Sequence, residues 1–152
     1  MKGLIFLMIF AFNSFGARLK IVSPCSNDKI LETEFEIKEG LSVGEVTIKK
    51  LEEFVIPHIG TAQGLNSIYN TPVGSDAINI IDNDEMHTYG WCYSINGFSP
   101  ELYPNAVDFT NNDEVVWWFG FARYKSGDWI TQCENSFTQR TTKFCDRILQ
   151  RN

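Results

Sequence analysis

The sequence lacks most of the patterns that mark an enzyme, a metal site or a nucleic-acid-binding protein. It has two histidines, and its four cysteines form no C-x-x-C pair, so the ligand spacing of a zinc site is absent. It contains no G-x-S-x-G elbow, no Cys–His nucleophile motif and no phosphate-binding glycine loop. Basic residues are scarce, with 13 Lys and Arg against 19 Asp and Glu, whereas phosphate binding needs a basic face. We therefore expect no enzyme, no nucleic-acid partner, no metal and no obligatory cofactor.

Long apolar runs are also absent after the first sixteen residues. The run 4–12 is unbroken for nine residues and follows a single lysine. It is too short to span a bilayer as a helix and has the length of a signal-peptide h-region. Cleavage after Gly16 leaves small residues at −1 and −3, whereas cleavage one residue later would put Phe15 at −3. We expect residues 1–16 to be a signal peptide and the remainder to be secreted or periplasmic, without a membrane span.

The remaining chain, 17–152, has the length of one domain. It shows no internal repeat, low-complexity segment or linker. Its net charge is about −7 once the lysine of the signal peptide is removed, which favours solubility over docking on anionic lipid. We expect a core over about 33–133 and a polar tail over 134–152.

Four cysteines in an exported chain indicate disulfides, with three possible pairings. We predict Cys92 with Cys133, which would connect two neighbouring strands of the aromatic region. We predict Cys25 with Cys145, which would tether an N-terminal strand to the tail.

The first part of the domain predicts a strand followed by one helix. Residues 33–40 alternate apolar and charged residues up to Gly40, as in a half-buried strand. Ser42 and Glu45 then have the spacing of a capping box, and apolar residues recur at helical spacing until Pro57 ends the segment.

The rest of the chain predicts strands and turns. Short strands are expected within 64–74 and 77–84, and a longer strand over 90–96 would place Trp91, Tyr93 and Ile95 on one face. Asn96-Gly97 is a strong turn signal. Residues 101–113 read as a turn-rich connection, and 114–124 and 128–133 as two further strands. Strand, capped helix and then several strands predict an α+β, β-grasp-like mixed sheet with one main helix on one face, stabilised by disulfides.

The segment 115–121 is apolar at both parities, although a half-buried strand should alternate. One parity is expected to face the helix, in the same layer as Trp91 and Tyr93. The other could be covered by the connection 98–112 and the tail. Alternatively, it could be an aromatic patch, with Trp118, Tyr124 and Trp129 as its exposed members, because clustered exposed aromatics mark interaction sites.

Two motifs give the chain a family resemblance. Gly90, Trp91, Tyr93, Asn96 and Gly97 match a G-W-x-Y-x-x-N-G pattern, and the segment 113–118 matches a D-x-V-x-W strand. Together they resemble the transcobalamin-like C-terminal domain, in the soluble-ligand-binding β-grasp superfamily, over roughly 33–124. This resemblance implies the fold, and it places the chain near bacterial domains of largely unknown function. In vitamin B12 carriers a similar domain closes over a corrinoid held by a larger helical domain, for which this chain has no room.

These observations predict a secreted, non-catalytic binding module that contacts another exported protein or an envelope component through an aromatic sheet face. The alternative is a carrier of a small ligand, either a corrinoid-like cofactor or a glycan stacked on Trp and Tyr rings. A pocket lined by the aromatics would favour the carrier. The candidate binding residues are Trp91, Tyr93, Trp117, Trp118, Tyr124 and Trp129.

Three other features have weaker functional interpretations. Residues 82–87 offer carboxylates and His87 on what reads as a solvated acidic turn, without the glycine and distal glutamate of an EF-hand. His58 reads as a partner of the helix dipole, and Arg123 as one half of a surface ion pair. Paired carboxylates could serve a hydrolase, but among 19 acidic residues such a pair has almost no specificity.

Overall fold

A mixed β-sheet forms the centre of the protein, and a computed structural model describes it for residues 16–26, 28–37, 40–135 and 145. The expected signal peptide, except Gly16, and most of the expected tail lie outside these residues. The sheet strands are β1 (Ala17–Val22), β2 (Lys29–Phe35), β5 (Ile78–Ile80), β6 (Glu85–Ile95), β7 (Glu114–Lys125) and β8 (Asp128–Asn135). The other elements are helix α1 (Val43–Glu53), the hairpin strands β3 (His58–Thr61) and β4 (Gly64–Ile68), and the short 3₁₀ helices η1 (Gly74–Ala77) and η2 (Pro104–Ala106).

The longest strand, β7, organises the sheet. The strand order is β2-β1-β7-β6-β5, and β8 also pairs with β7. β6 follows β7 along one edge in antiparallel register, from Ile95 opposite Val115 to Glu85 opposite Lys125. The other edge is shared, because β1 pairs in parallel with 114–117 and β8 pairs antiparallel with 120–125. The parallel β1–β7 pair makes this a mixed sheet, as predicted.

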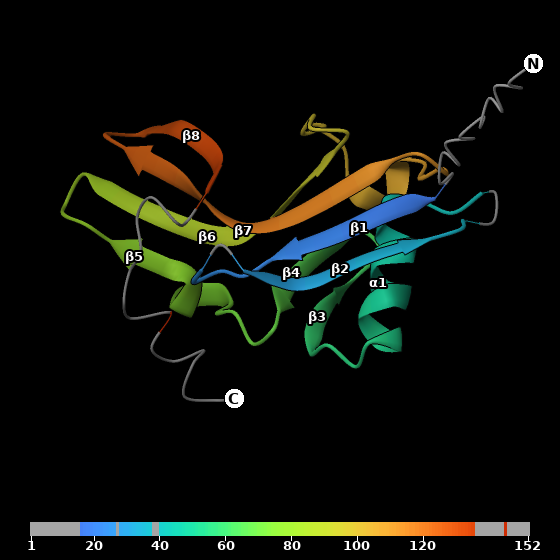
Figure 1. The fold of residues 1–152 in the computed structure, drawn as a ribbon. Coiled ribbons are helices and arrows are strands. Elements are labelled where there is room, and N and C mark those ends of the chain that lie inside the picture. The colour runs from blue at the N-terminus through green and yellow to red at the C-terminus, as the bar shows by residue number, and fades with distance from the viewer. Residues whose placement is uncertain (1–15, 27, 38–39, 136–144, 146–152) are drawn as a thin grey trace, which may run out of the picture.

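Helix α1 covers one face of the sheet, beside the β3–β4 hairpin (Figure 1). Its start is the predicted capping box: the Ser42 N–H donates to Glu45 Oε2 at 2.9 Å, and the Glu45 N–H donates to Ser42 Oγ at 3.3 Å. The Glu45 pKa is lowered by the backbone and side-chain hydrogen bonds from Ser42. Two donors that a helix start would leave unpaired are thus satisfied.

Cross-strand aromatic pairs lie under the helix and beyond it. Trp117 stacks on Tyr93 at 5.1 Å between ring centroids, and its indole N–H donates to Thr47 Oγ1 on α1 at 3.0 Å. Farther along the same two strands, Phe119 and Phe121 pack with Tyr89 against η1, forming a second buried cluster. Directly opposed aromatic residues stabilise a sheet through such contacts.

The connection 98–112 does not lie where we expected it, over the outer face of β7. Its end runs beside the start of the helix, where Val43 N–H donates to Val107 O and Phe109 N–H donates to Leu41 O. Phe109 is buried in the helix-side core. The connection therefore closes the end of the core under α1, where Phe109 is removed from solvent.

Several boundaries also differ from the sequence prediction. β2 begins at Lys29 rather than at residue 33, and β3 was not predicted. β6 begins at Glu85, so His87 lies in a strand and is buried rather than placed on an acidic turn. His58 begins β3, and its Nδ1 lies 3.0 Å from the carbonyl oxygen of Ile56, beyond the end of α1.

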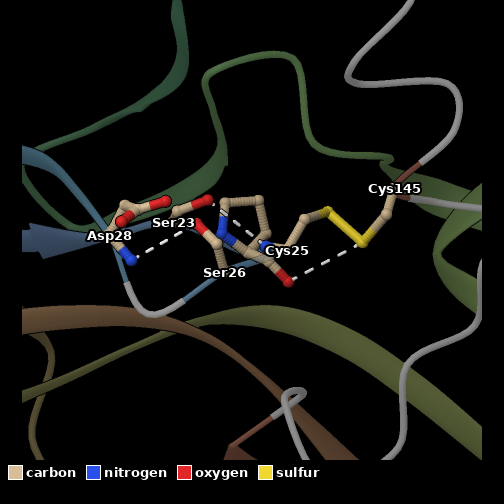
Figure 2. Close-up of a disulfide and its surroundings, with 6 residues drawn as sticks. Ser23, Cys25, Ser26, Asp28 and Cys145 are labelled. Atoms are coloured by element: carbon tan, nitrogen blue, oxygen red, sulfur yellow. Dashed lines mark hydrogen bonds between the residues drawn. A yellow bond between two sulfur atoms is a disulfide. The ribbon is translucent and has the colours of Figure 1, made fainter.

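Both disulfides form with the predicted pairing. Cys92 and Cys133 join β6 to β8 across β7, and Cys25 and Cys145 close a span of 120 residues. Figure 2 shows the second bridge beside the turn after β1, where the Cys25 N–H donates to Ser23 Oγ and the Asp28 N–H donates to Ser26 Oγ. The bridge holds residue 145 against this turn.

Candidate functional site

The two sequence motifs meet at a polar junction between β6 and β7. Asn96 Nδ2 donates to Asp113 Oδ1 at 2.7 Å, and the Glu114 N–H donates to Asn96 Oδ1 at 2.9 Å. Asn96 and Gly97 both have positive φ, as a two-residue turn of type I′ requires. Burial alone would raise the pKa of Asp113, but hydrogen bonds from Thr110 and Asn96 outweigh it and lower the pKa. These motif residues therefore fix the register of the strand pair.

The two strands present two faces, which we name by residue parity. The odd face carries the odd-numbered side chains of β6 and β7, and the even face carries the even-numbered ones, because directly opposed residues point the same way. On the odd face Trp117 is only 1 % exposed and Tyr93 is also buried, and burial raises the pKa of the Tyr93 hydroxyl. The expectation that Trp117 and Tyr93 contact a partner is corrected: both are core residues.

Trp91 has an intermediate position on the odd face. It is half-buried, its ring lies against Phe119, and its indole N–H donates to Thr71 Oγ1 at 2.8 Å. Trp91 therefore holds the segment after β4 in place, and one part of its ring packs in the core.

The even face brings together the three aromatics expected to be exposed. Tyr124 and Trp129 lie opposite each other on β7 and β8, with ring centroids 5.3 Å apart. Trp129 is 50 % exposed, whereas Trp118 and Tyr124 are half-buried. The Trp118 indole N–H donates to the Cys133 carbonyl at 3.1 Å, which fixes that ring against β8. Trp129 is the member most available to a partner.

The Cys92–Cys133 bridge covers the middle of the even face. It passes over Gly120, where a Cβ atom would lie 3.2 Å from Cys92 Sγ and 2.7 Å from the Glu134 carbonyl oxygen. Glycine leaves the space that the bridge and the curled β8 occupy. The even-numbered side chains of β7, which a half-buried strand would expose, are thus covered in part by the disulfide and by β8.

A groove of about 320 Å³ lies on the even face beside this bridge. Gly90, Ala122 and Thr88 contribute small side chains or none, and nothing lies within 4 Å of a Cβ placed on Gly90. Trp129, Gln132 and Cys133 also line the groove, from β8. It combines an apolar surface and a half-exposed indole with a few polar groups, as small-ligand and side-chain sites do.

Sequence analysis identified Trp129 but missed the glycines that create the groove. Gly90 and Gly120 face each other in the β6–β7 register. A glycine inside a strand is a signal of close backbone approach or of room for a ligand. The signal was present in both strands, but only the register places the two glycines together.

The charged end of the β6–β7 pair is a network of ion pairs. Glu85 Oε2 lies 3.1 Å from Lys125 Nζ, and Glu85 Oε1 lies 3.8 Å from Arg123 Nε, which confirms that Arg123 is part of an ion pair. The hydrogen bond from Lys125 is the main cause that lowers the Glu85 pKa. The His87 Nε2 atom lies 3.3 Å from the same carboxylate, and its ring packs in a tilted orientation against Phe121, with 4.9 Å between ring centroids. Among the described residues, no group of three or more His, Cys, Asp or Glu is placed to hold a metal ion.

The family comparison matches about a third of the chain. Residues 69–120 match a domain of unknown function, DUF4430. The DUF4430 segment runs from the end of β4 to the middle of β7, so it includes both motifs, η1 and the glycine pair. It agrees with the expectation of a domain family without an assigned activity. No curated protein matches the chain.

One solved structure with a low overall likeness is a protein of Ruminococcus gnavus described as a "putative metal binding protein". It is 13 % identical, with a TM-score of 0.42, and the match covers 68 % of this chain and 94 % of that chain. At this TM-score the likeness supports no inference about fold or ligand. Within the described part of the chain, no helix is long and apolar enough to cross a membrane.

Proposed function

We propose that this protein is an exported, non-catalytic binding module that contacts another exported protein or an envelope component through its even face. The observation that carries the proposal is the half-exposed Trp129 beside a groove in which Gly90 carries no side chain. An aromatic anchor next to a small, largely apolar depression is the composition of an interaction hot spot. The two disulfides are compatible with an oxidising compartment outside the cytoplasm.

We also propose that the domain is β-grasp-like and related to the transcobalamin-like C-terminal domain. The mixed sheet, helix α1 across one face and the junction of the two motifs through Asn96 and Asp113 support this relationship. The even-face groove is near the lower limit of volume for small-ligand sites. A volume of about 320 Å³ accommodates one ring and is too small for a corrinoid.

The second candidate is a glycan carrier, and the polar groups beside Trp129 favour it. Thr88 and Gln132 line the groove with the indole ring, so a sugar ring could stack on Trp129 and hydrogen-bond to these side chains. A pocket lined by aromatics was the feature expected to favour a carrier. The two candidates differ in what remains bound when the protein is purified.

A photo-crosslinking experiment with native mass spectrometry tests the proposal. A crosslinker replaces Gln132 in the exported, oxidised protein, and a matched variant carries it at Val55, which is exposed and does not line the groove. We expect one specific protein or envelope adduct at residue 132, which is lost in Gly90→Val because valine fills the groove.

The outcomes separate the two candidates. A retained ligand with the mass of a saccharide, absent from Gly90→Val, would establish the glycan carrier instead. Equal crosslinking at residues 132 and 55, together with a clean apo mass, would contradict both.

A further inference from the structure

Among the described residues, no strand pairs with the outer edge of β6 over the middle of this strand. β5 pairs with β6 only from Met86 to Thr88, and at the other end Ile95 pairs with Phe98. Between these two contacts, residues 89–94 form the outer edge of the sheet. We call these six positions the edge window.

The backbone of the edge window presents hydrogen-bonding groups outward. Asn96 N–H donates to Glu114 O of β7, so the even residues of β6 bond to β7. The odd residues bond to the other side, where Ile81 N–H donates to Glu85 O and Ile95 exchanges two bonds with Phe98. Trp91 and Tyr93 have this outward parity, and among the described residues no backbone partner is assigned to their N–H and C=O groups. Unpaired edges of this kind are templates for an added strand.

A cleft runs beside the edge window between β6 and β4. Two depressions of about 640 and 310 Å³ share Leu65, Asn66 and Trp91, so they lie next to each other, and we refer to them together as the cleft. Exposed apolar residues line both parts of it: Ile59, Val73 and Ile78 in the larger part, and Leu102 and Tyr103 in the smaller. None of the described residues that line it is charged, although the chain carries a net charge of −6.

We propose that the edge window binds an extended, uncharged segment of another polypeptide as an additional β-strand. Trp91 and Tyr93 would each exchange an N–H and a C=O bond with the segment, and its alternate side chains would enter the apolar cleft. The absence of charge along the lining selects an uncharged segment, because a charged side chain would lose its hydration without a partner. This site adjoins the even-face groove, with which it shares lining residues at 88–92 and Cys133. Trp129 lines only the groove, whereas Val73 and Leu102 line only the cleft, so the two sites can be tested separately.

A second copy of this chain does not fit the edge window through its own β6. β6 is eleven residues long, whereas the edge window has six positions and is bounded by β5. If two copies paired antiparallel with Trp91 opposite Trp91, Asn96 of one copy would lie opposite Met86 of the other, where Ile80 already pairs. The occupant is therefore a short strand, such as a chain terminus or a protruding loop.

Nuclear magnetic resonance of the oxidised, ¹⁵N-labelled protein tests this site with a defined probe. The probe is a capped, uncharged hexapeptide of alternating threonine and valine, and its control is the same peptide N-methylated at the pairing amides. We expect the probe at millimolar concentration to shift the amides of Trp91 and Tyr93 and to slow their hydrogen exchange by about tenfold. The N-methylated peptide should do neither.

Charged rim variants locate the binding side chains of the cleft. Val73→Lys and Leu102→Lys should each weaken probe binding by about tenfold, because the lysine is desolvated in the apolar cleft. Val55→Lys is the matched control, since Val55 is exposed and lines no part of the cleft.

Four results would overturn the proposal: no shift at Trp91 and Tyr93, an equal response to the N-methylated peptide, shifts confined to Trp129, or self-association through the same amides without the probe. The third would leave the even face as the peptide site.

Discussion

Two opposed glycines have different roles on the even face of the sheet. Gly120 lies under the Cys92–Cys133 bridge, and a Cβ there would lie 2.7 Å from the Glu134 carbonyl oxygen. Gly90, directly opposite, has open space where its Cβ would be. Gly120 thus allows the strands and the bridge to approach, whereas Gly90 leaves room for the groove.

We expect Gly120→Ala to destabilise the fold by about 1–3 kcal/mol, because backbone must move to admit the methyl group. Gly90→Ala should change stability by less than about 1 kcal/mol, since it adds a methyl group into open space. Urea denaturation of both variants under non-reducing conditions gives the comparison. Equal losses would show that the bridge does not confine residue 120.

The buried indole of Trp117 depends on one hydroxyl. Thr47 Oγ1 accepts from Trp117 Nε1 and also donates to the Val43 carbonyl at 2.7 Å. Thr47→Val keeps the shape of the side chain but leaves the indole N–H without its acceptor. We expect a loss of about 1–3 kcal/mol in the free energy of unfolding. Thr47→Ser, which retains the hydroxyl, is the control, and an equal loss in both variants would assign the effect to packing.

At the scale of elements, the β6–β7 pair shows what sequence patterns can predict. The Asn96-Gly97 turn, the capping box of α1 and the helix-facing parity of Trp91 and Tyr93 are local or periodic signals, and the structure confirms each of them. The sequence left open whether Trp117 belongs to the parity that faces the helix, and Tyr93 was named both as helix-facing and as a candidate binding residue. An apolar stripe on a strand predicts that one face of the strand is covered. How far each side chain on that face is exposed depends on which distant segment packs against it.

The junction at the end of this pair should contribute a pH dependence to stability. Hydrogen bonds from Thr110 and Asn96 lower the Asp113 pKa below its unfolded value despite burial, so the folded state binds fewer protons than the unfolded state near that pKa. This contribution is present above the unfolded pKa and is lost as the pH falls through the lower, folded pKa, in the range below about 4.

We therefore expect Asp113→Asn to destabilise the fold at pH 7 and to differ less from the unsubstituted protein at pH 3. Thermal unfolding at both pH values measures the difference. Asp128→Asn, at the exposed start of β8, is the matched control. If Asp113→Asn lowers stability equally at both pH values, the residue stabilises the fold through its hydrogen-bonding geometry and not through its charge.

At the scale of the whole molecule, the two disulfides join different levels of structure. Cys92–Cys133 spans 41 residues within the β6–β8 region, whereas Cys25–Cys145 spans 120 residues and encloses almost the whole domain. A longer closed loop restricts the unfolded chain more strongly.

Replacing either pair of cysteines by serine should reduce the free energy of unfolding by about 3–5 kcal/mol, with the Cys25–Cys145 pair costing about 1 kcal/mol more. Denaturation of the two double variants beside the oxidised protein checks the order. The reverse order would mean that the packing of Cys92 against Gly120 and Trp118 outweighs loop entropy.

The sequence by itself determined the disulfide-rich character, the capped helix, the β-rich second half and the Asn-Gly turn, because these depend on composition and on residues close together in the chain. Only the tertiary structure decided that β1 pairs in parallel with β7, that the connection 98–112 closes the helix-side core, and that Gly90 lies opposite Gly120. It also decided that Trp117 is buried while Trp129 is exposed. Strand order and exposure arise from contacts between residues tens of positions apart, and the periodicity of a single strand does not specify which strands lie beside it.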